Sequence, residues 1–149
     1  MVVYVDSNIF VHILMGTELA DTAKRIFRPG ESFVTSQAAL EEAIYVGLRL
    51  LAADRLNIRS AHQLRRHLAK HGPAFAYDYL SALTSFLRDT CIVILVDNTN
   101  IDDVVKIMSA YKLMPNDALI AATCKLHQVS VIATFDEDFR RVDFLQVIP

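Results

Sequence analysis

The chain has 149 residues, 53% of them hydrophobic, and a formal net charge of −2 at pH 7. This length allows one domain with a full hydrophobic core, so we expect residues 1–149 to form a single domain with a helical segment at about 52–89. The near-neutral charge excludes binding of nucleic acid through overall charge, and no apolar run approaches a membrane span of about 18 residues. We therefore expect a soluble, cytoplasmic protein whose two cysteines, Cys91 and Cys124, are reduced core thiols.

The first third of the chain alternates β-prone and helical stretches. Val2 to Val5 is a short strand candidate, and Asp6 follows it directly. Ser7 and Asn8 have side chains that can cap a helix running to about residue 15. The next expected elements are a helix over 17–27, a strand over 32–35 and a helix over 36–51.

The remainder continues the same alternation. The run CIVILV at 91–96 is continuous and apolar, which predicts a strand covered on both faces. The other expected elements are helices over 60–70, 74–88, 101–111 and 115–127 and strands over 129–134 and 144–148. Strands that alternate with helices, without hairpin signals, predict an α/β fold with a parallel sheet and helices on both faces.

Acidic residues lie near the ends of the predicted strands. Asp6 and Asp136 each come just after a strand, and the carboxyl ends of parallel strands share one edge, where ligands bind. Glu41 and Glu42 lie on the helix that follows the second strand, and Asp117 lies in the first turn of an apolar helix. These acids are therefore candidates for one site at the edge of the sheet.

Each acid also has an ordinary structural explanation. Asp117 can be a helix cap or a partner of the helix dipole, which should keep it ionised, and Asp6 can be a turn residue. Together, however, converging carboxylates repel one another unless a divalent cation neutralises them. Mg²⁺ and Mn²⁺ prefer oxygen ligands, whereas zinc prefers histidine or cysteine. Such a cluster is typical of metal-assisted hydrolysis of a phosphodiester.

Four segments of the chain together resemble the PIN-domain family, and within it the VapC-type toxins of toxin–antitoxin pairs. They are VDSNIF at 5–10, an acidic residue early in the helix after the second strand, PNDALIAATC at 115–124 and TFDEDF at 134–139. The resemblance implies a three-layer α/β/α sandwich with a central, mostly parallel sheet. It also implies an endoribonuclease dependent on Mg²⁺ or Mn²⁺, which acts on RNA, forms a homodimer and binds a small antitoxin protein.

The resemblance also implies the roles of individual residues. The catalytic, metal-binding acids are Asp6, Glu42, Asp117 and Asp136. We prefer Glu42 to Glu41 because the apolar helix stripe follows Glu42 directly. The same comparison makes Asp138 an auxiliary metal ligand, and makes Asn8 and Thr134 supports that orient Asp6 and Asp136.

Local charge indicates where RNA would lie. Residues 49–71 carry six arginines or lysines and a single acid, Asp54. Phosphate contacts need such a local excess, so we predict RNA binding at Arg65 and Arg66, and also at Arg140 and Arg141 beside the acidic edge. A basic helix face that serves only solubility is the alternative.

Three other functions stay open at this point. An aspartyl phosphotransferase also places an Asp after a strand, although its usual second Asp is replaced here by Asn8. A non-catalytic RNA-binding relative would share the fold, but the acids are intact at all four positions. A PIN-domain nuclease of rRNA or tRNA processing or of RNA quality control would carry the same residues as a toxin.

Overall fold

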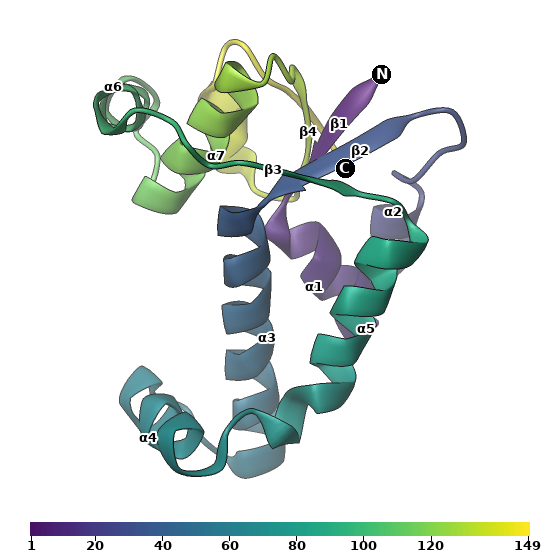
Figure 1. The fold of residues 1–149 in the computed structure, drawn as a ribbon, viewed down its shortest axis with the longest axis vertical. Coiled ribbons are helices and arrows are strands. Elements are labelled where there is room, and N and C mark those ends of the chain that lie inside the picture. The colour runs from purple at the N-terminus through teal and green to yellow at the C-terminus, as the bar shows by residue number, and fades with distance from the viewer.

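A five-stranded sheet lies at the centre of the computed structural model, which describes residues 1–149 (Figure 1). Its strands, in spatial order, are β3 (Val93–Leu95), β2 (Ser32–Ser36), β1 (Val2–Val5), β4 (Val131–Ala133) and β5 (Gln146–Ile148). Every neighbouring pair is parallel, and parallel strands need crossover connections, which the helices supply. The α/β fold predicted from the alternation of strands and helices is confirmed.

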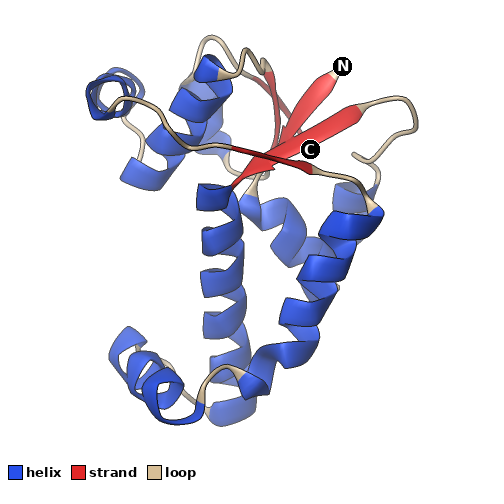
Figure 2. Ribbon diagram, in the orientation of Figure 1, coloured by secondary structure: helices blue, strands red, loops and turns tan.

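Helices cover both faces of this sheet (Figure 2). The helices are α1 (Ser7–Met15), α2 (Ala20–Lys24), α3 (Gln37–Leu56), α4 (Ala61–His71), α5 (Tyr77–Asp89), α6 (Ile101–Tyr111) and α7 (Pro115–Leu126), with 3₁₀ turns η1 (Ala74–Ala76) and η2 (Glu137–Arg141). Side chains alternate along β1, so Tyr4 packs against α6 and α7, while Val3 and Val5 pack against α1, α3 and α5. Two buried clusters on opposite faces give the predicted three layers.

The second half of α3, together with α4, η1 and the adjoining turns of α5, projects away from the sheet as an arm (Figure 1). A small buried cluster of Leu51, Ala76 and Tyr79 holds this arm together. The Tyr79 hydroxyl donates to the Ala43 carbonyl at 2.7 Å, and a methyl group on Gly47 would overlap the Tyr79 ring. Gly47 thus permits the close approach of α5 to α3.

Several predicted elements differ from the structure in extent. The helix expected over 17–27 is reduced to the single short helix α2, whereas α3 continues past residue 51 to Leu56. The prediction that the 91–96 run is covered on both faces is wrong, because β3 is an edge strand and Val93 is 59% exposed. Cys91 is likewise exposed rather than in the core, and only Cys124 is a buried thiol.

None of the helices combines the length and the apolar character that crossing a lipid bilayer requires.

Candidate functional site

Asp6 lies where β1 ends and α1 begins, with only 3% of its surface exposed. It is itself the N-cap of α1, because its Oδ1 accepts a hydrogen bond from the Ser7 backbone N–H at 2.7 Å. The prediction that Ser7 and Asn8 cap this helix is therefore wrong. Burial, with the added charges of Glu42 and Asp136, raises the pKa of Asp6 to about 6.

Thr134 and Asn8 hold the second oxygen of Asp6. The Thr134 hydroxyl donates to Asp6 Oδ2 at 2.7 Å, and Asn8 Nδ2 donates to the same oxygen at 3.1 Å. Asn8 Oδ1 accepts from the Phe135 backbone N–H at 3.1 Å, and Thr134 Oγ1 accepts from that of Asp136 at 3.0 Å. These bonds join the end of β1 to the end of β4, so the two strand ends that the sequence placed at one edge are connected there.

Asp136 and Asp138 lie at the start of η2, directly after this connection. Asp136 Oδ1 accepts from the Asp138 backbone N–H at 2.8 Å, and Asp138 Oδ1 accepts from the Arg141 guanidinium at 2.9 Å. The Oδ2 atoms of both aspartates accept no hydrogen bond from the chain. Each acid therefore keeps one oxygen available to a ligand.

Glu42 reaches the same edge from the second turn of α3. Asn116 Nδ2 donates to Glu42 Oε2, which fixes the direction of this carboxylate. The charge of Glu42 contributes to the raised pKa of Asp6 and of Asp117. Glu41 is exposed and forms no side-chain hydrogen bond or ion pair. Of the two neighbouring glutamates, Glu42 is thus the one that the structure brings to the other acids.

Asp117 lies in the first turn of α7 and is half-buried. Its pKa is raised to about 7 by burial and by the charges of four neighbouring carboxylates, those of Asp136, Asp6, Glu42 and Asp138. The expectation that the helix dipole keeps it ionised is wrong for the metal-free protein, because burial and repulsion together outweigh the dipole.

This set of donors fits a hard divalent cation. All five candidate ligands are carboxylates, and their mutual repulsion is the penalty that such an ion removes. No three acidic, histidine or cysteine side chains form a ready-made ligand cage. Mg²⁺ usually keeps several waters, so some of these carboxylates can hold such an ion through water rather than directly.

One histidine pair has the spacing of a zinc-ligand pair but lies elsewhere. His67 and His71 are one turn apart on α4, with ring centroids 4.8 Å apart. This helix occupies the end of the arm far from the sheet, so the pair adds no ligand to the acidic edge (Figure 1).

Two residues that position the acids were missed by the sequence analysis. Asn116 is separated from Glu42 by 74 residues, and nothing in the sequence pairs them. Asp97 accepts from the Ala38 backbone N–H at 2.8 Å and from the Thr123 hydroxyl at 3.1 Å, so it ties the start of α3 to α7. Asp97 comes soon after β3, and the rule that identified Asp6 as an acid following a strand would have found it.

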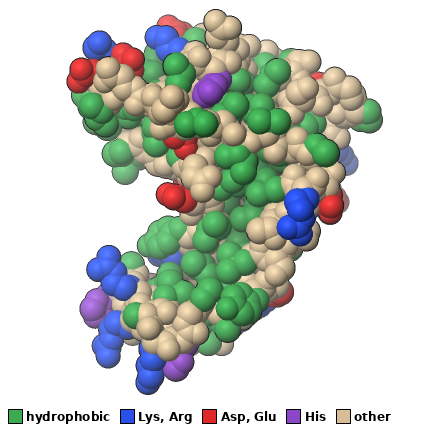
Figure 3. All heavy atoms as spheres, in the orientation of Figure 1, with side chains coloured by type: hydrophobic (Ala, Val, Ile, Leu, Met, Phe, Trp, Pro, Cys, Tyr) green, Lys and Arg blue, Asp and Glu red, His purple; other side chains and the backbone are tan.

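The four arginines predicted to bind RNA fall into two classes. Arg140 pairs with Glu137, and Arg141 donates to Asp138 and to two backbone carbonyls at the end of α6. Arg65 and Arg66 lie on α4, are exposed and form no ion pair. Figure 3 shows basic side chains gathered over α4, across a notch whose opposite rim carries acidic side chains. Of these four arginines, the two without an ion pair are thus on the arm.

Comparison with known protein families gives a match that spans nearly the whole chain. The profile of the family described as PIN domain matches residues 3–145. A relative named ribonuclease VapC6, from Methanocaldococcus jannaschii, is 27% identical over 150 residues, which cover 98% of this chain and 95% of the relative. Ribonuclease VapC2 of the same organism is 54% identical over 43 residues, or 29% of each chain.

Solved structures share the fold at lower sequence identity. VapBC2 from Rickettsia felis, solved bound to a DNA fragment from its promoter, has a TM-score of 0.61 at 14% identity and covers 99% of this chain and 98% of the other. VapC20 from Mycobacterium tuberculosis, described as a toxin that cleaves the sarcin–ricin loop, also has a TM-score of 0.61, at 17% identity with 99% of both chains covered.

Proposed function

This chain belongs to the PIN domain family, and from that premise we propose that it is a divalent-metal-dependent endoribonuclease, the toxin of a VapBC-type toxin–antitoxin pair. The observation that carries the proposal is the convergence of carboxylates at the carboxyl edge of the sheet, where burial, together with their mutual repulsion, raises the pKa of Asp6 to about 6 and of Asp117 to about 7. Acids that perturb one another in this way at one edge are a functional-site signature.

We assign the cation to Asp6, Glu42 and Asp117, with Asp136 and Asp138 beside them. When bound, Mg²⁺ or Mn²⁺ would neutralise these carboxylates and polarise a phosphoryl oxygen of the substrate. Thr134 and Asn8 keep Asp6 Oδ2 in place, and Asn116 does the same for Glu42 Oε2. Residues that are already fixed before substrate arrives lose little entropy when the reaction begins.

Asp136 is the residue that we assign to the attacking water. Its Oδ1 is occupied by the Asp138 backbone N–H, whereas its Oδ2 is not bonded within the chain. That oxygen can accept a hydrogen bond from a water and take its proton as the water attacks the phosphorus in line. The P–O bond to the leaving ribose oxygen then breaks, and that oxygen takes a proton from the solvent. The Arg141 guanidinium balances part of the charge nearby by pairing with Asp138.

An RNA cleavage assay tests the function directly. Wild-type protein with Mg²⁺ or Mn²⁺ should cleave RNA, and excess chelator should stop the reaction. Asp6→Asn should cleave none while keeping its circular dichroism spectrum, and the matched control Asp21→Asn, an exposed aspartate on α2, should cleave as wild type. Full activity of Asp6→Asn or in excess chelator contradicts the proposal.

A small antitoxin and a second copy of the chain are the partners that we propose. The support is likeness to proteins solved as toxin–antitoxin complexes, among them one from Klebsiella pneumoniae with a TM-score of 0.54 at 21% identity, covering 99% of this chain and 96% of that one. We place the pair in the cytoplasm, where free cysteines and RNA occur together. We also propose that residues 1–149 act as one domain, because α3 runs from the sheet into the arm. Light scattering of the chain, alone and co-expressed with the product of an adjacent small reading frame, tests the assembly.

A further inference from the structure

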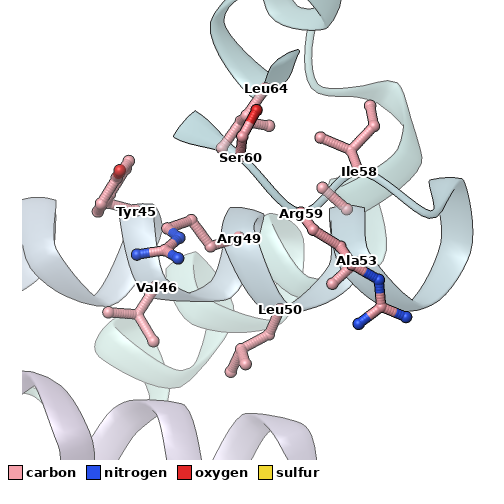
Figure 4. A pocket seen from close by; sticks show the side chains of 10 residues that line it. Tyr45, Val46, Arg49, Leu50, Ala53, Ile58, Arg59, Ser60 and Leu64 are labelled. Carbon is pink, nitrogen blue, oxygen red and sulfur yellow. The ribbon is translucent and has the colours of Figure 1, made fainter. Parts of the chain in front are cut away.

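A groove runs between α3, from Tyr45 onward, and α4. Its walls carry aromatic, apolar and basic side chains, among them Tyr45, Arg49, Leu50, Arg59 and Leu64 (Figure 4). Arg65 lines the adjoining hollow. We call this feature the α3–α4 groove. One hollow of about 420 Å³ adjoins a second of about 480 Å³, and Tyr45 and Leu64 line both. Hollows of this size suit a ligand as large as a nucleotide.

The groove begins next to the acidic edge. Glu42, Tyr45 and Arg49 are spaced by three and four residues on α3, so they lie along one face of the helix. The helical rise places Tyr45 only about 4.5 Å, and Arg49 about 10 Å, from Glu42 along the axis. A strand whose scissile phosphate is held at the acids would therefore reach Tyr45 within one nucleotide or two.

The charges around the groove favour an anion. No acid occurs between Asp54 and Asp78, and the only cation of that stretch in an ion pair is Arg55, which pairs with Asp78. Arg59, just before α4, and Arg65, Arg66 and Lys70 on α4 form no ion pair, in contrast with Arg140 and Arg141 at the acidic edge. The basic surface of α4 in Figure 3 thus lacks internal counter-charges.

Tyr45 supplies a second feature that suits nucleic acid. It is 47% exposed, unlike the buried Tyr4 and Tyr79, and the Arg49 guanidinium lies 5.9 Å from its ring centroid. An exposed aromatic ring beside cations is the arrangement on which unpaired bases stack in proteins that bind single strands. Single exposed apolar residues are common on helix surfaces, but Tyr45 lies between the acidic edge and the basic residues around α4.

We propose that the α3–α4 groove binds an unpaired nucleotide of the RNA substrate beside the scissile phosphate, with its base stacked on Tyr45 and adjoining phosphates on Arg49, Arg59 and Arg65. This inference rests on the proposed ribonuclease function and adds to it a preference for unpaired RNA next to the cut. Such a groove can also receive an amphipathic protein helix. The unpaired arginines and the shared face with Glu42 favour RNA, and the experiment separates the two occupants.

The first measurement is binding of a fluorescently labelled single-stranded RNA, followed by anisotropy in the Asp117→Asn background so that the RNA stays intact. Tyr45→Ala should weaken binding about tenfold, whereas Tyr45→Phe, which keeps the ring, should bind as the parent does. Arg49→Ala should weaken binding and reduce its salt dependence. Arg28→Ala, which removes an exposed and unpaired arginine before β2, is the matched control and should change neither.

The second measurement locates the nucleotide, using active protein and substrates with one abasic site placed at each position around the cut. At a single position near the cut the missing base should raise KM about tenfold for the wild type and leave KM of Tyr45→Ala unchanged.

If the wild type cleaves RNA but Tyr45→Ala and Arg49→Ala bind it normally, the groove is not an RNA subsite and the nuclease function stands. If those variants instead lose binding of a synthetic acidic amphipathic helix, the occupant is a protein. Absence of both cleavage and RNA binding in the wild type overturns the inference and the proposed function together.

Discussion

The acidic edge of the sheet and the basic arm each hold like charges close together, but the two regions accommodate the repulsion in different ways. At the edge, negative charges are buried or half-buried, and hydrogen bonds from Thr134 and Asn8 hold Asp6 in place despite the repulsion. On the arm, positive charges repel too, but they stand in water, where repulsion is weak, and few buried residues lie beneath them. The buried carboxylates of the edge need a counter-ion at a defined position, whereas the exposed cations of the arm can attract an anionic partner without one. Substitutions at the edge should therefore change the chemistry, and substitutions on the arm should change binding.

The sharpest test of the edge compares the two neighbouring glutamates of α3. Glu42→Gln should lower kcat by at least about a hundredfold, because Gln cannot replace an anionic ligand and the loss of even a supporting residue costs 10–100-fold. Glu41→Gln makes the same chemical change on an exposed side chain without contacts and should leave kcat unchanged. Single-turnover cleavage of a short RNA with Mn²⁺ measures both. Equal losses in the two variants would mean that the edge is not the reaction centre.

Removing the hydroxyl that holds Asp6 in place should have the next largest effect. Thr134→Val keeps the shape of the side chain but removes the hydroxyl that donates to Asp6 Oδ2 and accepts from the Asp136 backbone N–H. We expect Mn²⁺ affinity, measured by titration calorimetry, to fall about 10–100-fold. Thr90→Val, at the end of α5, also loses one hydrogen bond, to the Phe86 carbonyl, and should bind Mn²⁺ as wild type does. An unchanged affinity in Thr134→Val would show that the network is only structural.

The sequence predicted the edge better than the arm, for a physical reason. Asp6 and Asp136 follow strands, and parallel strands bring their ends to one edge whatever the side-chain details. The partner of Glu42, by contrast, is Asn116, and the contact depends on how α3 and α7 pack, which local patterns do not encode. The raised pKa of Asp117 depends on the same packing. The prediction for the CIVILV run was wrong because a continuous apolar pattern does not distinguish a central strand from an edge strand.

On the arm, Gly47→Ala should lower the stability of the protein without changing its metal binding. The added methyl group overlaps the Tyr79 ring, so α5 must move away from α3 and the free energy of unfolding should fall by about 1–3 kcal/mol. In a Tyr79→Leu background the clash is relieved, and the same substitution should then stabilise the protein by up to about 1 kcal/mol through helix propensity. Chemical denaturation measures both effects. Mn²⁺ affinity should be unchanged, and a parallel loss of metal binding would mean that the arm and the edge are not separable.

The smallest expected effect concerns the stability of the edge without metal. The pKa of Asp117 is raised to about 7, so between about pH 4 and pH 7 the folded chain holds a proton that the unfolded chain has released. The free energy of unfolding therefore falls as pH rises through this window and stays low above it.

Asp117→Asn removes that penalty and should raise the free energy of unfolding at pH 8 by about 1–2 kcal/mol, less than the full shift implies because the carboxyl is only half-buried. At pH 5, where folded Asp117 is mostly protonated, the gain should be smaller. Thermal unfolding at both pH values, with and without Mn²⁺, measures the difference, and Mn²⁺ at pH 8 should stabilise the wild type more than the variant. A variant less stable than wild type at pH 8 without metal would show that Asp117 is a structural cap of α7, and the edge would then lack the unbalanced charge that distinguishes it from the arm.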